Sequence, residues 1–182
     1  MSEARARFVM QRMRELVTVD QEAGCLIARG RRIFLLRDRT LQQLVTIGSD
    51  MFGPAVWGAL YEAGLRSGRI FGQRVIDQIG PDPGLVMAEI LGSLAGSGWG
   101  VFRVIYFEPR HRIVIRVLNS VFAEPGRGYT QRHFPLGHLA GVFEVLFKRP
   151  YRGEEALCIG KNDPFCEFVY YPEEGEKAAQ YQ

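Results

Sequence analysis

The sequence predicts an α+β fold, in which helices pack on one face of an antiparallel sheet. Helical spacing of apolar residues dominates the first half of the chain, and two pairs of Val-, Ile- and Phe-rich segments follow with one more helical segment between them. This order of elements is typical of α+β folds. The length of 182 residues corresponds to one domain that buries a substantial core.

The composition is that of an ordinary soluble globular protein, with 47% hydrophobic and 24% charged residues. No uncharged apolar run is long enough to cross a bilayer, and the N-terminal segment lacks the apolar core of a signal peptide. We therefore expect a cytoplasmic protein. Three cysteines in that setting favour free thiols or a metal site over a disulfide framework.

Residues 1–39 are predicted to form a basic arm, with an amphipathic helix within 3–17 and a short hairpin of 26–28 and 33–36. The arm holds nine arginines and five acidic residues, whereas the rest of the chain is close to neutral. A solvated amphipathic face explains this charge most simply, and a nucleic-acid-binding surface is the alternative. Cys25 is expected to be a small buried hydrophobe rather than a ligand.

Helical spacing begins again at Thr40, which is expected to cap the helix, and Pro54 is expected to kink that helix or to begin a new one. A further helix is predicted from Pro83 to the Gly-Ser-Gly turn at 96–98. Glycines inside helices usually permit close approach of a second helix or a ligand. Four glycines fit that role: Gly48, Gly58, Gly64 and Gly68.

Two strands, 99–107 and 112–122, are predicted to pair through the turn at 108–111. A helix over 136–147 follows, with Pro135 in its first turn and with glycines at 137 and 141 that form a flat patch for close packing. The final hairpin pairs 151–157 with 167–171. Residues 40–172 then form the main domain, and 173–182 form a tail.

The loop of this final hairpin brings two thiols and a carboxylate together. Glu155 lies three residues before Cys158, and turn residues separate Cys158 from Cys166. Thiolates and a carboxylate are ligands that zinc accepts in a tetrahedral site. A fourth ligand has to come from elsewhere in the chain.

Two segments carry a combination of residues typical of one protein family: RHFPLGHLAGVFEVLF (132–147) and YRGEEALCIGKNDPFCEF (151–168). Gly98-Trp99-Gly100 precedes the first strand pair, and Asn119-Ser120 closes it. This combination resembles the 4-vinyl reductase domain family over roughly residues 40–172. The resemblance implies the fold of the vesicle-tethering TRAPP subunits, which often dimerise. Relatives include effector domains of phenol-sensing activators, proteins tied to bacteriochlorophyll synthesis, and hydrocarbon-binding proteins that hold small hydrophobic molecules in an internal pocket.

In the phenol sensors of this family, three cysteines and one glutamate bind a structural zinc. Carried over to this sequence, Glu155, Cys158 and Cys166 match three of these ligands. The remaining cysteine falls at Arg132, which cannot bind a metal, so the neighbouring His133 is the candidate fourth ligand. The alternative is a degenerate site, in which the thiols pack as apolar groups and Glu155 pairs with Arg132.

An apolar pocket requires aromatic lining with few polar groups. The candidate lining residues are Trp57, Tyr61, Phe71, Trp99, Phe122, Tyr129, Phe134 and His138. Each of them also fits an ordinary core. His138 falls off the main apolar stripe of its helix, so it is either exposed or faces the pocket, where its ring nitrogens would hydrogen-bond a ligand.

The sequence therefore favours a sensor or regulatory domain that binds a small hydrophobic molecule and forms a homodimer. One alternative is an interaction scaffold with the same fold. Another is an accessory protein or enzyme of tetrapyrrole or aromatic metabolism, although no nucleophile setting, phosphate loop or dinucleotide fingerprint is present. We name no catalytic residue.

Overall fold

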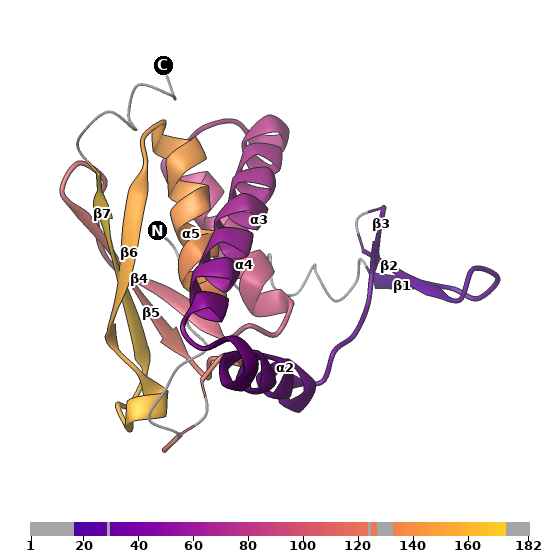
Figure 1. Cartoon of the computed structure of the whole chain (residues 1–182). Helices are drawn as coiled ribbons and strands as arrows, with labels where there is room; N and C mark the ends of the chain where they lie inside the picture. Colours follow the sequence, from indigo (N-terminus) through magenta and orange to yellow (C-terminus); the bar gives the residue numbers. More distant parts are fainter. Residues whose placement is uncertain (1–16, 29, 124, 127–132, 174–182) are drawn as a thin grey trace.

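The structure is a computed structural model that describes residues 17–28, 30–123, 125–126 and 133–173. Two antiparallel sheets and a group of helices make up this part of the chain (Figure 1). The helices are α2 (Asp38–Phe52), α3 (Ala55–Ile79), α4 (Pro83–Gly96), α5 (His133–Phe147) and the short 3₁₀ helix η1 (Ile159–Lys161). The strands are β1 (Val17–Asp20), β2 (Cys25–Ala28), β3 (Arg31–Ile33), β4 (Val101–Glu108), β5 (Arg112–Leu118), β6 (Tyr151–Leu157) and β7 (Cys166–Pro172).

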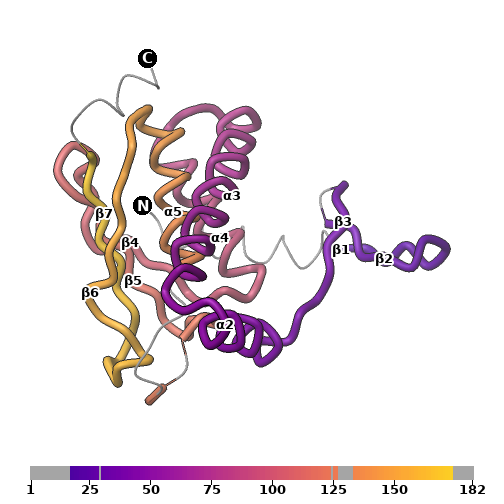
Figure 2. Tube along the Cα trace, viewed as in Figure 1, coloured from indigo at the N-terminus to yellow at the C-terminus, as the bar shows by residue number. Residues whose placement is uncertain are grey.

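The larger sheet has the strand order β4-β5-β7-β6, and every neighbouring pair is antiparallel. Its two hairpins, β4–β5 and β6–β7, are those expected from the sequence. Helix α5 lies against this sheet and α3 packs on α5, so all helices of the body stand on one side of the sheet (Figures 1 and 2). The predicted α+β fold, with helices on one face of an antiparallel sheet, is confirmed.

Helices α3 and α5 approach each other closely because glycines face glycines across their contact. A Cβ added at Gly64 or Gly68 would overlap backbone atoms of α5, and one added at Gly137 or Gly141 would overlap backbone atoms of α3. The close packing expected of these four glycines is confirmed. Gly58 does not share it, because a Cβ there would meet nothing within 4 Å.

The helix boundaries follow local chemistry. The side chain of Asp82 accepts a hydrogen bond from the Leu85 N–H at the start of α4, and Pro83 occupies the first turn, as expected. Pro54 precedes α3 and starts it as a new helix. The cap expected at Thr40 is wrong, because α2 begins two residues earlier, at Asp38, with Arg37 in the cap position.

The N-terminal arm differs in part from the prediction. Strands β2 and β3 form the expected hairpin, but the second strand ends at Ile33, and β1 adds a third strand that the sequence analysis missed. Strand β1 was missed because its four residues are all exposed, so no buried side shows in its pattern. The helix expected within 3–17 lies almost entirely outside the described residues, as does most of the tail. No helix among the described residues is long and apolar enough to cross a membrane.

Candidate functional site

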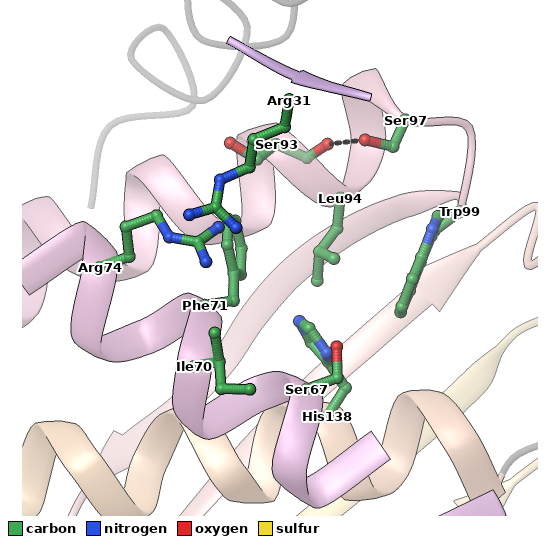
Figure 3. A pocket seen from close by; sticks show the side chains of 10 residues that line it. All are labelled: Arg31, Ser67, Ile70, Phe71, Arg74, Ser93, Leu94, Ser97, Trp99 and His138. Carbon is green, nitrogen blue, oxygen red and sulfur yellow. Dashed lines mark hydrogen bonds between the residues drawn. The ribbon is translucent and has the colours of Figure 1, made fainter. Parts of the chain in front are cut away.

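A cavity of about 600 Å³ lies on the side of α3 that faces α4. Its apolar wall consists of Ile70 and Phe71 of α3, Leu94 of α4, and Trp99, which follows α4 (Figure 3). This volume falls within the range of small-molecule sites, roughly 300–1,000 Å³, and an aromatic lining is usual in them. The other lining residues are Arg31, Ser67, Arg74, Ser93, Ser97 and His138.

His138 of α5 points into this cavity (Figure 3). Its ring lies 5.2 Å from the Trp99 ring and 5.7 Å from the Phe71 ring, centroid to centroid. Only 4% of the residue is exposed, and neither Nδ1 nor Nε2 has a hydrogen-bond partner among the described residues. Burial lowers the pKa of His138 to about 4, so the ring is neutral at pH 7 and offers one donor and one acceptor.

Ser93 supplies a second buried polar group to the same cavity. Its Oγ has no hydrogen-bond partner within the described part of the chain, and the residue is 4% exposed. The nearby Ser97 hydroxyl donates instead to the Ser93 carbonyl, at 2.9 Å. Because buried polar groups in proteins are nearly always satisfied, these two groups need partners that the described residues do not supply, and a water molecule or a ligand in the cavity can supply them.

The structure brings three of the eight predicted lining residues to the cavity: Phe71, Trp99 and His138. Phe122 and Phe134 contact Trp99 at ring distances of 5.0 and 5.6 Å and thus form a layer behind it. The remaining three lie elsewhere: Trp57 stacks on His133 at 5.2 Å, Tyr61 faces Gly137 of α5, and Tyr129 lies outside the described residues. The choice between an exposed and a pocket-facing His138 is therefore settled in favour of the pocket.

The sequence analysis missed the polar lining of the cavity. One side of α3 carries three lining residues at helical spacing: Ser67, Phe71 and Arg74. This spacing is visible in the sequence, but only Phe71 was predicted to line the pocket. Ser93 of α4 sits among apolar residues and Ser97 lies in the Gly-Ser-Gly turn after the helix, so neither carries a pattern of its own. Arg31 belongs to the distant arm, and no local signal connects it with the cavity.

A second site lies in the turn between β6 and β7. The ligand atoms of Glu155, Cys158 and Cys166 all lie within 4.8 Å of one another. Cys158 precedes η1, where its Sγ accepts a hydrogen bond from the Gly160 N–H at 3.2 Å, and its own N–H donates to Asp163 Oδ2 at 2.7 Å. Both thiols are almost fully buried. The predicted hairpin thus brings the three groups together.

The cluster supplies three of the four ligands that a tetrahedral site for a thiophilic metal ion requires. Burial raises the pKa of Cys158 and raises that of Cys166 to about 12, so both thiols stay protonated unless a bound cation stabilises the thiolates. His133, the candidate fourth ligand, is not part of the cluster; its ring stacks on Trp57. Arg132 lies outside the described residues.

Comparison with known proteins gives no matching family model. An uncharacterized protein of Methanocaldococcus jannaschii is 28% identical over 128 residues, which make up 70% of this chain and 71% of that protein.

Three solved structures share the fold. The phenol-responsive sensory domain of the transcription activator PoxR, in complex with phenol, matches with a TM-score of 0.79 at 16% identity, over 100% of this chain and 99% of that one. Subunit 3 of the trafficking protein particle complex of Naegleria fowleri, covalently bound to palmitic acid, matches with a TM-score of 0.56 at 17% identity, over 75% and 93%. A vinyl-4-reductase family protein of Methanocaldococcus jannaschii matches with a TM-score of 0.54 at 16% identity, over 78% and 85%. The likeness expected from the sequence is therefore confirmed at the level of the fold.

Proposed function

We propose that this chain, with a fold shared by a phenol-responsive sensory domain, is a sensor or regulatory domain that binds a small hydrophobic molecule in the cavity between α3, α4 and α5. One observation carries the proposal: His138 is buried among aromatic rings, with both ring nitrogens unpartnered among the described residues, and it faces an open cavity. An apolar molecule with one hydroxyl or carbonyl fills that cavity and satisfies the imidazole.

The binding energy comes from two sources. The ligand body is removed from water against Phe71, Leu94 and Trp99, which contributes roughly 25 cal/mol for each Å² of apolar surface buried. The polar atom of the ligand bonds to His138 or Ser93, which adds about 1 kcal/mol net and fixes the orientation. The aromatic rings around His138 also exclude water, so each hydrogen bond there is stronger than it is at the surface.

Calorimetric titration with 2-naphthol tests this function. We expect binding to the unmodified protein and about tenfold weaker binding to His138→Phe, because phenylalanine keeps the ring but loses both nitrogens. The matched control is His111→Phe, which changes an exposed histidine in the β4–β5 turn and should leave the affinity unchanged. Equal affinity in His138→Phe and the unmodified protein would place the ligand elsewhere.

We also propose that Glu155, Cys158 and Cys166 hold a structural zinc ion, which would join β6 to β7 at their shared turn. Support comes from the three converging donors and from the Gly160 N–H that bonds Cys158 Sγ, an interaction that stabilises a thiolate. His133 or a water molecule would complete four ligands, and His133 would first have to leave Trp57.

Metal analysis of protein purified without chelator tests the zinc proposal. We expect about one zinc per chain, lost in Cys158→Ser and Cys166→Ser but kept in Cys25→Ser, which changes the third cysteine away from the cluster. Protein without zinc would instead support a degenerate site of two packed thiols.

A homodimer is supported by exposed apolar side chains on α2 and on the segment before it. Phe34 and Leu35 are 78% and 83% exposed, and Met51 and Phe52 are 69% and 65% exposed. Leu44 and Ile47 are also exposed and share one face of α2 with Met51 at helical spacing. Monomeric proteins rarely leave such an apolar face open, and a second copy of this chain would cover it symmetrically.

Light scattering after size exclusion tests the homodimer. We expect a dimer for the unmodified protein and a monomer for Met51→Lys, whereas Ile105→Lys, which changes an exposed residue of β4, should stay dimeric. A monomeric unmodified protein that binds no apolar ligand would favour the second candidate function, an interaction scaffold that uses this patch for a different partner. Nucleic-acid binding by the arm and a cytoplasmic location stay predictions.

A further inference from the structure

Two arginines line the mouth of the cavity. Arg31 comes from β3 of the arm and Arg74 from α3, and in Figure 3 both guanidinium groups lie at the end of the cavity where Phe71 stands. Within the described part of the chain, neither of them forms an ion pair. By contrast, the other two arginines of α3 are both paired, Arg66 with Glu62 and Arg69 with Glu144.

Two adjacent guanidinium groups repel each other, and an anion between them turns this repulsion into attraction. The planar guanidinium matches a carboxylate in particular, because two parallel N–H groups donate to its two oxygens. Phe71 forms an apolar wall on one side of this position, so the interaction is less screened than at an open surface.

The cavity therefore has two polar regions separated by an apolar middle. Arg31, Arg74 and Ser93 lie at one end, His138 contributes unsatisfied ring nitrogens at the other, and Leu94 and Trp99 contribute apolar surface. We propose that the ligand is an amphiphilic carboxylate with an aromatic body, whose acid group is held by Arg31 and Arg74 and whose body lies against Phe71 and Trp99. This inference rests on the proposed function and names the chemical class of its ligand.

This mode of binding couples the ligand to the arm. Arg31 belongs to the β1–β3 sheet and Arg74 to the helical body, so one carboxylate bonded to both of them ties the arm to α3. A neutral ligand of the same shape fills the cavity without this tie. A charged ligand therefore orders the arm, whereas a neutral ligand does not.

A pair of probes with the same body separates charge from shape. Calorimetry at pH 7.5 compares 2-naphthoate with 2-naphthalenemethanol, which replaces the carboxylate by a neutral CH₂OH group. We expect 2-naphthoate to bind about tenfold more tightly, and Arg74→Gln and Arg31→Gln to remove this preference while affinity for the alcohol changes less than about twofold. Arg66→Gln, on the same helix but paired with Glu62, is the control for net charge and should keep the preference.

Hydrogen exchange of β1–β3 provides an independent readout. We expect 2-naphthoate to slow exchange of these strands and the alcohol to leave it unchanged, with the effect lost in Arg31→Gln. If both probes bind equally and the arginine variants do not alter this, the carboxylate inference is overturned and the proposed function stands. If neither probe binds, both are overturned.

Discussion

Helix α3 has two different sides, and the contrast between them explains how this fold combines a rigid body with an open site. On one side, Gly64 and Gly68 bring the helix so close to α5 that a Cβ at either position would overlap the backbone of α5, and the side chain of Val145 packs against Gly72. On the other side, Phe71 and Arg74 face a cavity that α4 leaves open. Close packing against α5 fixes the position of α3. The cavity can therefore stay open, because α3 does not need contacts on the cavity side to hold its position.

The two sides also treat polar groups differently. On the α5 side, Arg69 pairs with the buried Glu144, which is 3% exposed. On the cavity side, the His138 ring nitrogens and Ser93 Oγ have no hydrogen-bond partner, and Arg74 forms no ion pair, among the described residues. This difference is the one expected under the proposed function, in which a ligand satisfies the polar groups on the cavity side.

The largest effect is expected from a substitution on the glycine side. In Gly68→Ala, the new Cβ overlaps the backbone carbonyl of His138, so α3 and α5 have to move apart, and we expect a loss of about 3–5 kcal/mol in the free energy of unfolding. Urea unfolding measures it. The control is Gly58→Ala, where a Cβ meets nothing within 4 Å, and we expect a gain of about 0.5–1 kcal/mol there. Equal effects of the two substitutions would contradict the close contact.

An intermediate effect is expected from acid, through His138 at the cavity. Its pKa is about 4 in the folded protein and 6.5 when unfolded, so the unfolded state takes up the proton first as the pH falls. The contribution of His138 to the free energy of unfolding is complete above pH 6.5, and it decreases by about 3 kcal/mol as the pH falls to about 4. Thermal unfolding across this range should show a steeper loss in the unmodified protein than in His138→Phe. Parallel curves would mean that His138 is solvated or paired.

The smallest effect is expected from Ser93→Ala, which removes an unsatisfied buried hydroxyl. Because Ser93 Oγ has no partner among the described residues, its loss should leave the free energy of unfolding unchanged or raise it by up to about 1 kcal/mol. A clear loss of stability, measured by urea unfolding, would instead reveal a structural hydrogen bond.

The glycine side of α3 could be predicted from the sequence through Gly64 and Gly68 but not Gly72, whereas only part of the cavity lining could be predicted. Glycines inside otherwise good helices have few explanations, so Gly64 and Gly141 indicated close packing at once. His138 was harder to place because α5 is buried on two sides: Leu136 and Leu139 belong to the apolar stripe, while His138 lies beside α3. A single apolar stripe describes only one buried side of such a helix.

Nonlocal contacts limited the remaining predictions. Arg31 reaches the cavity only through the tertiary position of the arm, and nothing in its own neighbourhood indicates this. The cluster of Glu155, Cys158 and Cys166 was predictable because all three lie in one hairpin whose turn residues fix their approach. The predicted fourth member, His133, is not part of this cluster, because its ring stacks on Trp57.

The most direct test of the central claim is the ¹⁵N NMR spectrum of the imidazole rings, with and without 2-naphthol. The chain contains three histidines, so the spectrum is simple, and His138→Phe assigns one of them by its absence. We predict that the His138 nitrogens show a neutral ring at pH 7 and shift on addition of 2-naphthol, while those of His111 and His133 stay in place. A saturating ligand that leaves the His138 signals unmoved would contradict the claim that this cavity is the binding site.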